Sequence, residues 1–150
     1  MPNRSEHDSA ALVTGTTFAY SRAINFKSPL PIVEAVGGAI GSLIGGRLPD
    51  RLDPPTSPNH RGLAHAVLPV AVVGTLTISS LDHAQNWLRG QALQYHGSRL
   101  LSSPPLQAGS YEFFEWVCYL LAGVLAGFVA GYASHLVLDF QTSRCFPIIC

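Results

Sequence analysis

Histidine and aspartate side chains gather at a few places in this chain, and both residue types are common metal ligands. His135 and Asp139 are four residues apart, so on a helix they share one face and can reach the same cation. The stretch PDRLDPPTSPNHRGLAH, residues 49–65, holds two aspartates and two histidines, and another histidine lies near the N-terminus. The candidate metal ligands are His7, Asp50, Asp53, His60, His65, His135 and Asp139.

This ligand set suits zinc, because zinc binds neutral imidazole nitrogen and carboxylate oxygen. Carboxylate-rich sites also suit manganese or iron. The set is larger than one tetrahedral ion needs, so the sequence indicates one or two divalent ions. In a two-ion site, Asp50 or Asp53 would be the natural bridging carboxylate.

Four apolar segments of helical length must position these residues: 9–24, 31–48, 63–81 and 113–140. At a rise of 1.5 Å per residue, the second and third are about 27 to 29 Å long, close to the membrane's hydrocarbon core of about 30 Å. The fourth, at about 42 Å, exceeds it. We expect Pro49 to end the second segment and Pro69 to kink the third. Residues 82–110 should form a polar connection before the fourth segment, in which LDHAQNWLRGQALQYH can form a surface helix and SSPPLQAGS is a loop.

The composition agrees with a membrane protein. Hydrophobic residues make up 47% of the chain and charged residues only 12%, whereas soluble domains carry about 25% charged residues. We therefore predict a single membrane-embedded domain over residues 1–150, an all-α bundle of about four helices with up-down topology. The net charge of zero disfavours nucleic acid as a partner and leaves membrane lipids. A soluble all-helical protein is the alternative fold.

Small residues recur every four positions in the second and fourth segments, and each row leads into possible ligands. One row is Gly38, Ser42, Gly46 and Asp50, with Gly37, Gly41 and Gly45 beside it. The other row is Gly123, Gly127, Gly131, His135 and Asp139. Each row predicts a smooth track on which another helix backbone can lie closely. Helix packing alone accounts for the glycines but not for the ligands that continue the rows.

An up-down arrangement places all of the candidate ligands at one end of the bundle. His7 precedes the first segment, Asp50 follows the second, His65 opens the third and His135 closes the fourth. The polar stretch 49–65 would then form one wall of a metal site at a membrane face. The same topology excludes His83 and His96 from the site, as solvated residues, and it places Glu34 in a solvated ion cluster with Arg22 and Lys27.

The segments GGRLPDRLDPPTSPNHRGLAH and AGYASHLVLDFQTSRCFPII resemble the YdjM-type family of membrane-bound, metal-dependent hydrolases. The shared features are an early histidine, a Leu-Pro-Asp motif, a His-Arg-Gly motif with a further histidine, and a late Ser-His followed by aspartate. The resemblance covers most of the chain apart from residues 82–112. It implies a small multi-span protein of a bacterial-type inner membrane, with metal ligands His7, Asp50, His60, His65, His135 and Asp139.

The chain departs from the family pattern at two points. The family often has Asp-Xaa-Asp after the proline, whereas here the acids are Asp50 and Asp53, so Asp53 matches less well. The family also often has threonine before and serine after the second histidine of this stretch, where this chain has Ala64 and Ala66. Hydroxyls there would hydrogen bond around the metal, so their loss bears on full activity.

The predicted function is metal-dependent hydrolysis at the membrane surface, with a phosphoester of a lipid-like substrate as the target. Arg61 or Arg51 could clamp a phosphate, and Asp50 or Asp53 could act as the general base. A slight excess of arginine on the ligand side favours a cytoplasmic site. Two alternatives stay open: a non-catalytic metal-binding membrane protein, structural or part of an ion pathway, and a soluble helical phospholipase-like enzyme.

Overall fold

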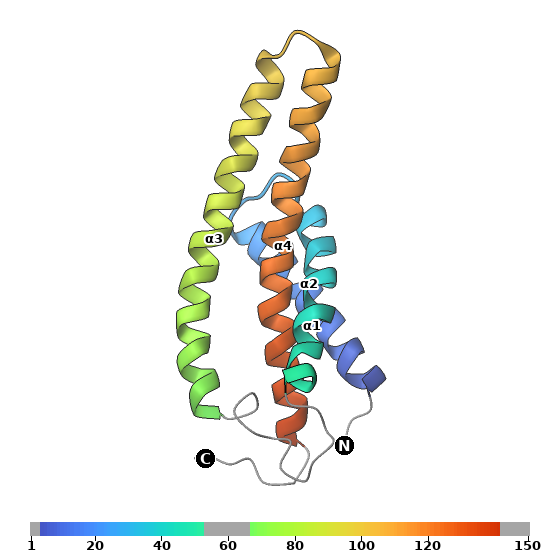
Figure 1. The fold of residues 1–150 in the computed structure, drawn as a ribbon, viewed down its shortest axis with the longest axis vertical. Helices are drawn as coiled ribbons and strands as arrows, with labels where there is room; N and C mark the ends of the chain where they lie inside the picture. Colours follow the sequence, from blue (N-terminus) through green and yellow to red (C-terminus); the bar gives the residue numbers. More distant parts are fainter. Residues whose placement is uncertain (1–3, 53–66, 142–150) are drawn as a thin grey trace.

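The computed structural model describes residues 4–52 and 67–141, with side chains described for 4–52 and 79–139. These residues form helices and no strand (Figure 1), so the all-α prediction is confirmed for this part of the chain. The helices are α1 (Arg4–Asn25), α2 (Pro31–Leu52), α3 (Val67–Leu101) and α4 (Pro105–Gln141). The predicted site residues that lie outside the described residues are Asp53, His60, Arg61 and His65, together with Ala64 and Ala66.

A short turn reverses the chain between α1 and α2. The amide of Ser28 donates a hydrogen bond of 2.8 Å to the carbonyl of Ala23, which closes the last turn of α1. Lys27 has a φ of 52°, the left-handed conformation in which many helices end. Pro31 then opens α2, where its missing amide proton removes no helical hydrogen bond, and Pro105 opens α4 in the same way.

The predicted polar connection over residues 82–110 is helical over most of its length. The helix expected in its first part is present, but it continues α3 instead of forming a separate helix, and the loop expected over residues 102–110 is wrong from Pro105 onward. α3 continues to Leu101, and α4 begins at Pro105. Within α3, Leu88 and Ala92 are buried and share a helix face, so a sparse apolar stripe packs this part of α3 along α4. The polar residues between them include good helix formers such as glutamine and arginine. The polar composition therefore concealed the continuity of this helix with the apolar part of α3.

The expected effect of Pro49 also needs correction. Pro49 does not end α2, which continues to Leu52. Pro49 lacks the amide proton that would bond to the carbonyl of Gly45, yet the helix continues for three more residues, and the Pro49 ring is fully buried. Pro69 is the third described residue of α3, and the kink expected there stays a prediction.

The helices alternate in direction along the chain. α3 and α4 form a long hairpin, and α1 and α2 lie beside the half of α4 that leads to its C-terminal end (Figure 1). α2 makes the most extensive contact with α4 and also packs on α1. The start of α1, the end of α2 and the end of α4 therefore meet at one end of the bundle, as the predicted up-down topology requires.

α2 and α4 approach so closely that both helices need glycine at the contact. A Cβ atom at Gly41 would lie against the carbonyl oxygen of Val124, and one at Gly127 against that of Gly38, far inside van der Waals contact in both cases. The other glycines that face the partner backbone in this way are Gly37, Gly45, Gly123 and Gly131. The predicted tracks are confirmed as the surface on which α2 and α4 pack.

The second small-residue row of α2 packs on α1 rather than on α4 alone. Its members meet a matching row of small residues on α1, and the order of the pairs shows that the two helices are antiparallel. The contacts pair Gly38 with Ala19, Ser42 with Gly15, and Gly46 with Ala11. α2 therefore lies between α1 and α4, in close contact with both.

Small and polar side chains fill the inside of the bundle, and large apolar side chains cover its outside. The largest fully buried side chains are Tyr119, His135, Gln85, Glu34, Pro49 and Ser42. Large apolar residues that are more than half exposed include Val13, Ile32, Val36, Phe113 and Val137. Within the described residues, one helical stretch, Pro105–Asp139, is long and apolar enough to cross a membrane. The predicted four-helix membrane bundle stays a prediction.

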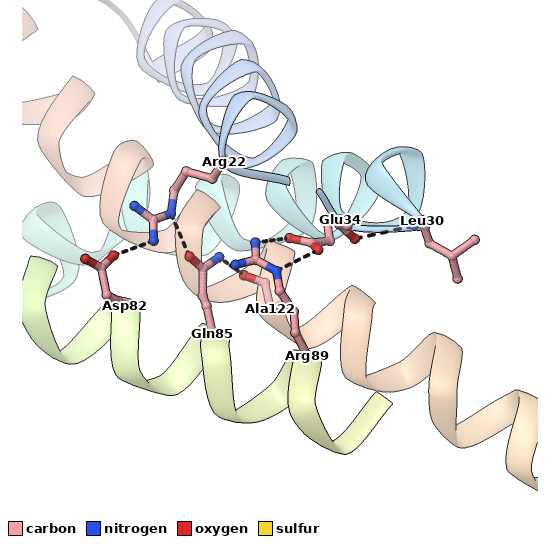
Figure 2. A network of polar contacts seen from close by, with 8 residues as sticks. Arg22, Leu30, Glu34, Asp82, Gln85, Arg89 and Ala122 are labelled. Carbon is pink, nitrogen blue, oxygen red and sulfur yellow. Dashed lines mark hydrogen bonds and ion pairs between the residues drawn. The ribbon is translucent and has the colours of Figure 1, made fainter. Parts of the chain in front are cut away.

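A buried ion pair joins α3 to α2. The Arg89 guanidinium donates hydrogen bonds of 3.0 and 2.6 Å to the two carboxylate oxygens of Glu34 (Figure 2). The Glu34 side chain is 0% exposed and that of Arg89 is 9% exposed. The prediction that Glu34 lies in a solvated ion cluster with Arg22 and Lys27 is therefore wrong. Its partner comes from the stretch of α3 that was expected to be a connection.

Further polar contacts extend this ion pair into a layer that ties α3 to α1 and α4. Arg22 on α1 donates to the carboxylate of Asp82 and to the side-chain oxygen of Gln85 (Figure 2). Gln85 in turn donates a hydrogen bond of 2.6 Å to the main-chain carbonyl of Ala122 on α4. We call Arg22, Glu34, Asp82, Gln85 and Arg89 the polar layer. It lies near the α1–α2 turn, away from the end where His7 lies.

The glycine tracks make a testable prediction about packing. Gly127→Ala places a methyl group against the Gly38 carbonyl, and we expect it to lower the free energy of unfolding by about 1 to 3 kcal/mol. Gly97→Ala is the matched control, because a Cβ atom at Gly97 meets nothing within 4 Å. It should be neutral or stabilise α3 by up to about 1 kcal/mol. Chemical unfolding in mild detergent measures both, and equal effects would contradict this packing.

The buried ion pair makes a second prediction. Arg89→Met leaves the Glu34 carboxylate buried without its partner, so we expect a loss of about 3 to 5 kcal/mol in the free energy of unfolding. Adding Glu34→Leu should restore most of that loss, because an apolar pair carries no desolvation cost. The exposed Glu112, which pairs with Arg99, supplies the control: Glu112→Gln should change stability by less than about 1 kcal/mol. Additive losses in the double variant would argue against a coupled pair.

Candidate metal centre

Four of the predicted ligands meet at one end of the bundle. His7 lies in the first turn of α1, Asp50 in the last turn of α2, and His135 and Asp139 near the end of α4. The sequence placed His7 just before its helix, whereas α1 already begins at Arg4 and carries His7 on its inner side. The structure therefore brings these four side chains together, and three of them, His7, His135 and Asp139, form a group that could hold a metal ion.

The packing rows explain why these side chains converge. Gly38 and Ser42 of α2 lie against Gly127 and Gly131 of α4, so each step of four in one helix matches a step of four in the other. Continued toward the helix ends, the same rows pair Gly46 with His135 and Asp50 with Asp139. The α1 row Ala19, Gly15 and Ala11 continues in the same way to His7. Each row therefore ends in a ligand.

The donor atoms of the cluster lie at separations that suit a shared cation. His135 Nε2 is 3.3 Å from Asp50 Oδ1 and 3.4 Å from Asp139 Oδ2. His7 Nε2 is 3.6 Å from Asp139 Oδ1. The two imidazole rings stack with their centroids 4.2 Å apart. One ligand atom from each of His7, His135 and Asp139 lies within 4.8 Å of the others. We call these three residues with Asp50 the ligand cluster.

These separations are compatible with ligands that share one divalent ion. Nitrogen and oxygen ligands at about 2.0 to 2.1 Å from zinc lie about 3.3 Å apart in a tetrahedron. The nitrogen–oxygen distances of 3.3 to 3.6 Å in the cluster are close to this spacing. In addition, His7 Nδ1 is buried and has no hydrogen-bond partner among the described residues. The residues present therefore fit a divalent ion.

Burial and the neighbouring charges favour the neutral imidazole form of His7, which is the form that binds metal. Desolvation lowers the pKa of its imidazole below the usual value, and the neighbouring His135 lowers it further, while Asp139 and Asp50 act in the opposite direction. A lowered pKa keeps the ring neutral at pH 7, and neutral imidazole is the form that binds metal. The cluster is closed on one side and open on another. The His135 side chain is 1% exposed, whereas that of Asp50 is 50% exposed.

The two histidines that were excluded from the site are indeed elsewhere. His83 is exposed on α3. His96 Nδ1 lies 3.0 Å from Glu115 Oε1, which is almost completely buried. Glu115 precedes His135 by 20 residues on α4, about 30 Å of helix. The expectation that His96 is merely solvated misses this contact with Glu115, whose other oxygen lies 3.7 Å from Arg99.

One ion pair next to the ligand cluster was not predicted from the sequence. Arg47 on α2 donates hydrogen bonds of 2.9 and 2.8 Å to the two carboxylate oxygens of Asp8 on α1. These hydrogen bonds lower the pKa of Asp8 below its usual value. Asp8 follows His7 directly, and Arg47 precedes Asp50 by three residues. The pair therefore joins the two helix ends that carry these ligands, and only the register between α1 and α2 reveals it.

Comparison of the chain with protein-family models, with curated proteins and with solved structures finds no match. The resemblance to the YdjM-type family accordingly stays a prediction. The functional proposal therefore depends on the geometry of the ligand cluster.

The charges around His7 predict how its ring titrates in metal-free protein. We expect His7 to titrate below the usual histidine pKa of about 6.5. Asp139→Asn should lower this pKa further, because it removes a carboxylate that favours the protonated ring. His135→Gln should raise it. NMR titration of the histidine ring protons measures each shift, with the His83 signal as internal reference. Shifts of the opposite sign would contradict the described cluster.

Proposed function

We propose that this protein is a membrane-embedded, metal-dependent hydrolase that acts at the membrane surface on a phosphoester of a lipid-like substrate. The observation that carries the proposal is the convergence of His7, His135 and Asp139 from two helices, with ligand atoms within 4.8 Å of one another. Asp50 adds a fourth ligand group at 3.3 Å from His135. Two imidazoles with two carboxylates form a donor set typical of zinc, and manganese or iron would also be accepted.

The distribution of side chains supports a place in the membrane. Bilayer-embedded helices associate through small and polar residues and present large apolar residues to lipid. α2 follows this pattern, with glycines toward both neighbours and Ile32, Val36, Ile40 and Ile44 exposed. In a water-soluble domain, so many exposed large apolar side chains would be unusual. α4 also has the length and composition of a membrane span. A soluble enzyme with the same ligands is less consistent with this surface.

The chain's own residues have separable roles in the proposed reaction. His7, His135 and Asp139 would hold a divalent ion, which when bound supplies Lewis-acid chemistry toward a phosphoryl oxygen and water. The carboxylate of Asp50 is half exposed at the open side of the cluster, so it can accept a proton from an approaching water molecule. We extend the same proposal to Asp53 and Arg61 as catalytic residues and to His60 and His65 as further ligands, with a second ion bridged by Asp50 or Asp53.

The location of the cluster supports the proposed substrate class. A site at the end of a membrane bundle lies at the depth of lipid headgroups, where phosphoesters are abundant. Arginines near the cluster, such as Arg4, Arg47 and Arg51, would favour an anionic substrate. We further propose that the protein is a YdjM-type hydrolase of a bacterial-type inner membrane with its site on the cytoplasmic side, where arginine-rich ends of membrane helices are favoured.

One observation favours a second candidate function, a metal-binding membrane protein without turnover. His135 is 1% exposed and Asp139 is 9% exposed, so most of the cluster is closed off from solvent, as in structural metal sites. In that case the ion would fasten α1 and α2 to α4. The half-exposed Asp50 distinguishes the two functions, because a purely structural site has no need of an open ligand.

Metal binding and hydrolysis can be tested on the purified protein in detergent. We expect the wild-type protein to retain about one or two divalent ions after purification. His135→Ala and Asp139→Ala should each weaken zinc affinity by more than about 100-fold, because each removes a direct ligand. His83→Ala is the control: it removes an exposed histidine from α3 and should leave metal content unchanged. Elemental analysis and zinc competition titration give the two readouts.

A screen with phosphomonoester and phosphodiester substrates separates the enzyme from its rival. Activity that is lost on chelation, restored by added metal and absent in His135→Ala would support the hydrolase. Metal bound at full occupancy with no turnover of any phosphoester would favour the structural role of the ion. A wild-type protein that binds no divalent metal would exclude both functions.

A further inference from the structure

A hollow with both charged and apolar walls lies between α1 and α2 next to the ligand cluster. Its volume is about 480 Å³, within the range of small-molecule sites. The residues that line it include Arg4, Ser5, Ser9, Leu12, Leu43 and Arg47, with Asp8 beside Arg47. The polar side of the hollow contains two guanidinium groups, two hydroxyl groups and one carboxylate, so its net charge is positive.

The hollow and the ligand cluster occupy the same helix turns. On α1, Arg4 and Asp8 lie within one turn of His7. On α2, Leu43, Arg47 and Asp50 are spaced by four and three residues, which places them along one helix face. A molecule seated between Arg4 and Arg47 would therefore have its polar end close to Asp50, the half-exposed carboxylate at the open side of the cluster.

The Asp8 contact holds the Arg47 side chain across the hollow. It uses Nε and Nη2 of Arg47, at 2.9 and 2.8 Å from the carboxylate oxygens, so Nη1 takes no part in it. The Arg47 side chain is 39% exposed. The Arg47 guanidinium is therefore held in one orientation and is accessible to solvent. Its Nη1 group is suited to donate a hydrogen bond to a phosphate oxygen.

The apolar side of the hollow continues down the outer face of α2. Leu12 on α1 is 40% exposed. On α2, Ile40 and Val36 follow Leu43 at helical spacing toward the middle of the bundle, and they are 46% and 51% exposed. The hollow is therefore cationic at the end near the ligand cluster and apolar toward the other end. A free inorganic anion would use only the first part of this surface.

We propose that this hollow binds an anionic amphiphile, with its phosphate group between Arg4 and Arg47 and its hydrocarbon chain against Leu12, Leu43 and the outer face of α2. The inference rests on the proposed function for the identity of the anionic group as a phosphoester. It adds the site that selects a lipid-like substrate and presents its head to the ligand cluster. Arg4 and Arg47 bind and orient the substrate, and neither residue is a metal ligand.

Octyl phosphate is the probe, and its binding to metal-free protein in a maltoside detergent can be measured by equilibrium dialysis. We expect octyl phosphate to bind at least about tenfold more tightly than inorganic phosphate, because the chain buries apolar surface. Arg4→Gln should weaken octyl phosphate binding about tenfold, the usual scale for one charge-assisted hydrogen bond. Leu43→Asn should weaken octyl phosphate but not inorganic phosphate.

Lys27→Asn is the matched control, because it removes a cation from the α1–α2 turn at the other end of the same helix pair, where asparagine tolerates the left-handed backbone. Its octyl phosphate affinity should equal that of the wild type. Equal binding of octyl and inorganic phosphate would overturn the proposal, as would an unchanged affinity in Arg4→Gln.

Metal binding, measured separately on the same samples, distinguishes failure of this inference from failure of the proposed function. Each variant of the hollow should bind zinc like the wild type, which also shows that it is folded. Octyl phosphate binding with the predicted Arg4 dependence in a protein without metal affinity would refute the hydrolase and retain the hollow. Metal-dependent hydrolysis with no dependence on Arg4 or Leu43 would refute the hollow alone.

Discussion

The direct contact of the α2 and α4 backbones is the constraint on which the rest of the structure depends. At Gly41 and Gly127 the partner's carbonyl oxygen lies where a Cβ atom would be, so no other residue fits without a shift of one helix. Such a contact permits one register between the two helices. Because the register is fixed along the glycine rows, it is also fixed where these rows reach Asp50, His135 and Asp139. The packing of α2 on α4 therefore also determines where the ligands lie.

The polar layer fixes the position of α3, just as the glycine contacts fix the register between α2 and α4. α3 packs on α4, but its links to α1 and α2 run mainly through the charged and amide groups of Arg22, Glu34, Asp82, Gln85 and Arg89. A buried ion pair adds little net stability, because desolvation offsets the attraction between its charges. It does penalise wrong arrangements, since a shifted α3 would leave Glu34 or Arg89 buried and alone. In this bundle the layer specifies position more than it adds strength.

The sequence was sufficient to predict four helices, their alternating directions and the shared end of His7, Asp50, His135 and Asp139, but not the full length of α3. It was sufficient because the ligands continue rows of period four whose packing role is set by glycine alone. The partner of Glu34 was not predictable, since Arg89 lies in a stretch that reads as polar connection and is held in α3 by a few apolar residues. The Arg47–Asp8 pair was missed because it depends on the register of two helices, which no local pattern encodes.

The continuous rows also make the cluster sensitive to changes in helix length. One residue inserted between Gly131 and His135 would rotate everything after it by about 100° around the axis of α4 and advance it by about 1.5 Å. The two ligands of α4 would then point away from Asp50 although every original side chain were still present. Even four inserted residues, about one turn, would restore the direction only roughly and would move the ligands by about 6 Å. Substitutions can change the chemistry of the ligand cluster, whereas insertions and deletions in α4 would separate its ligands.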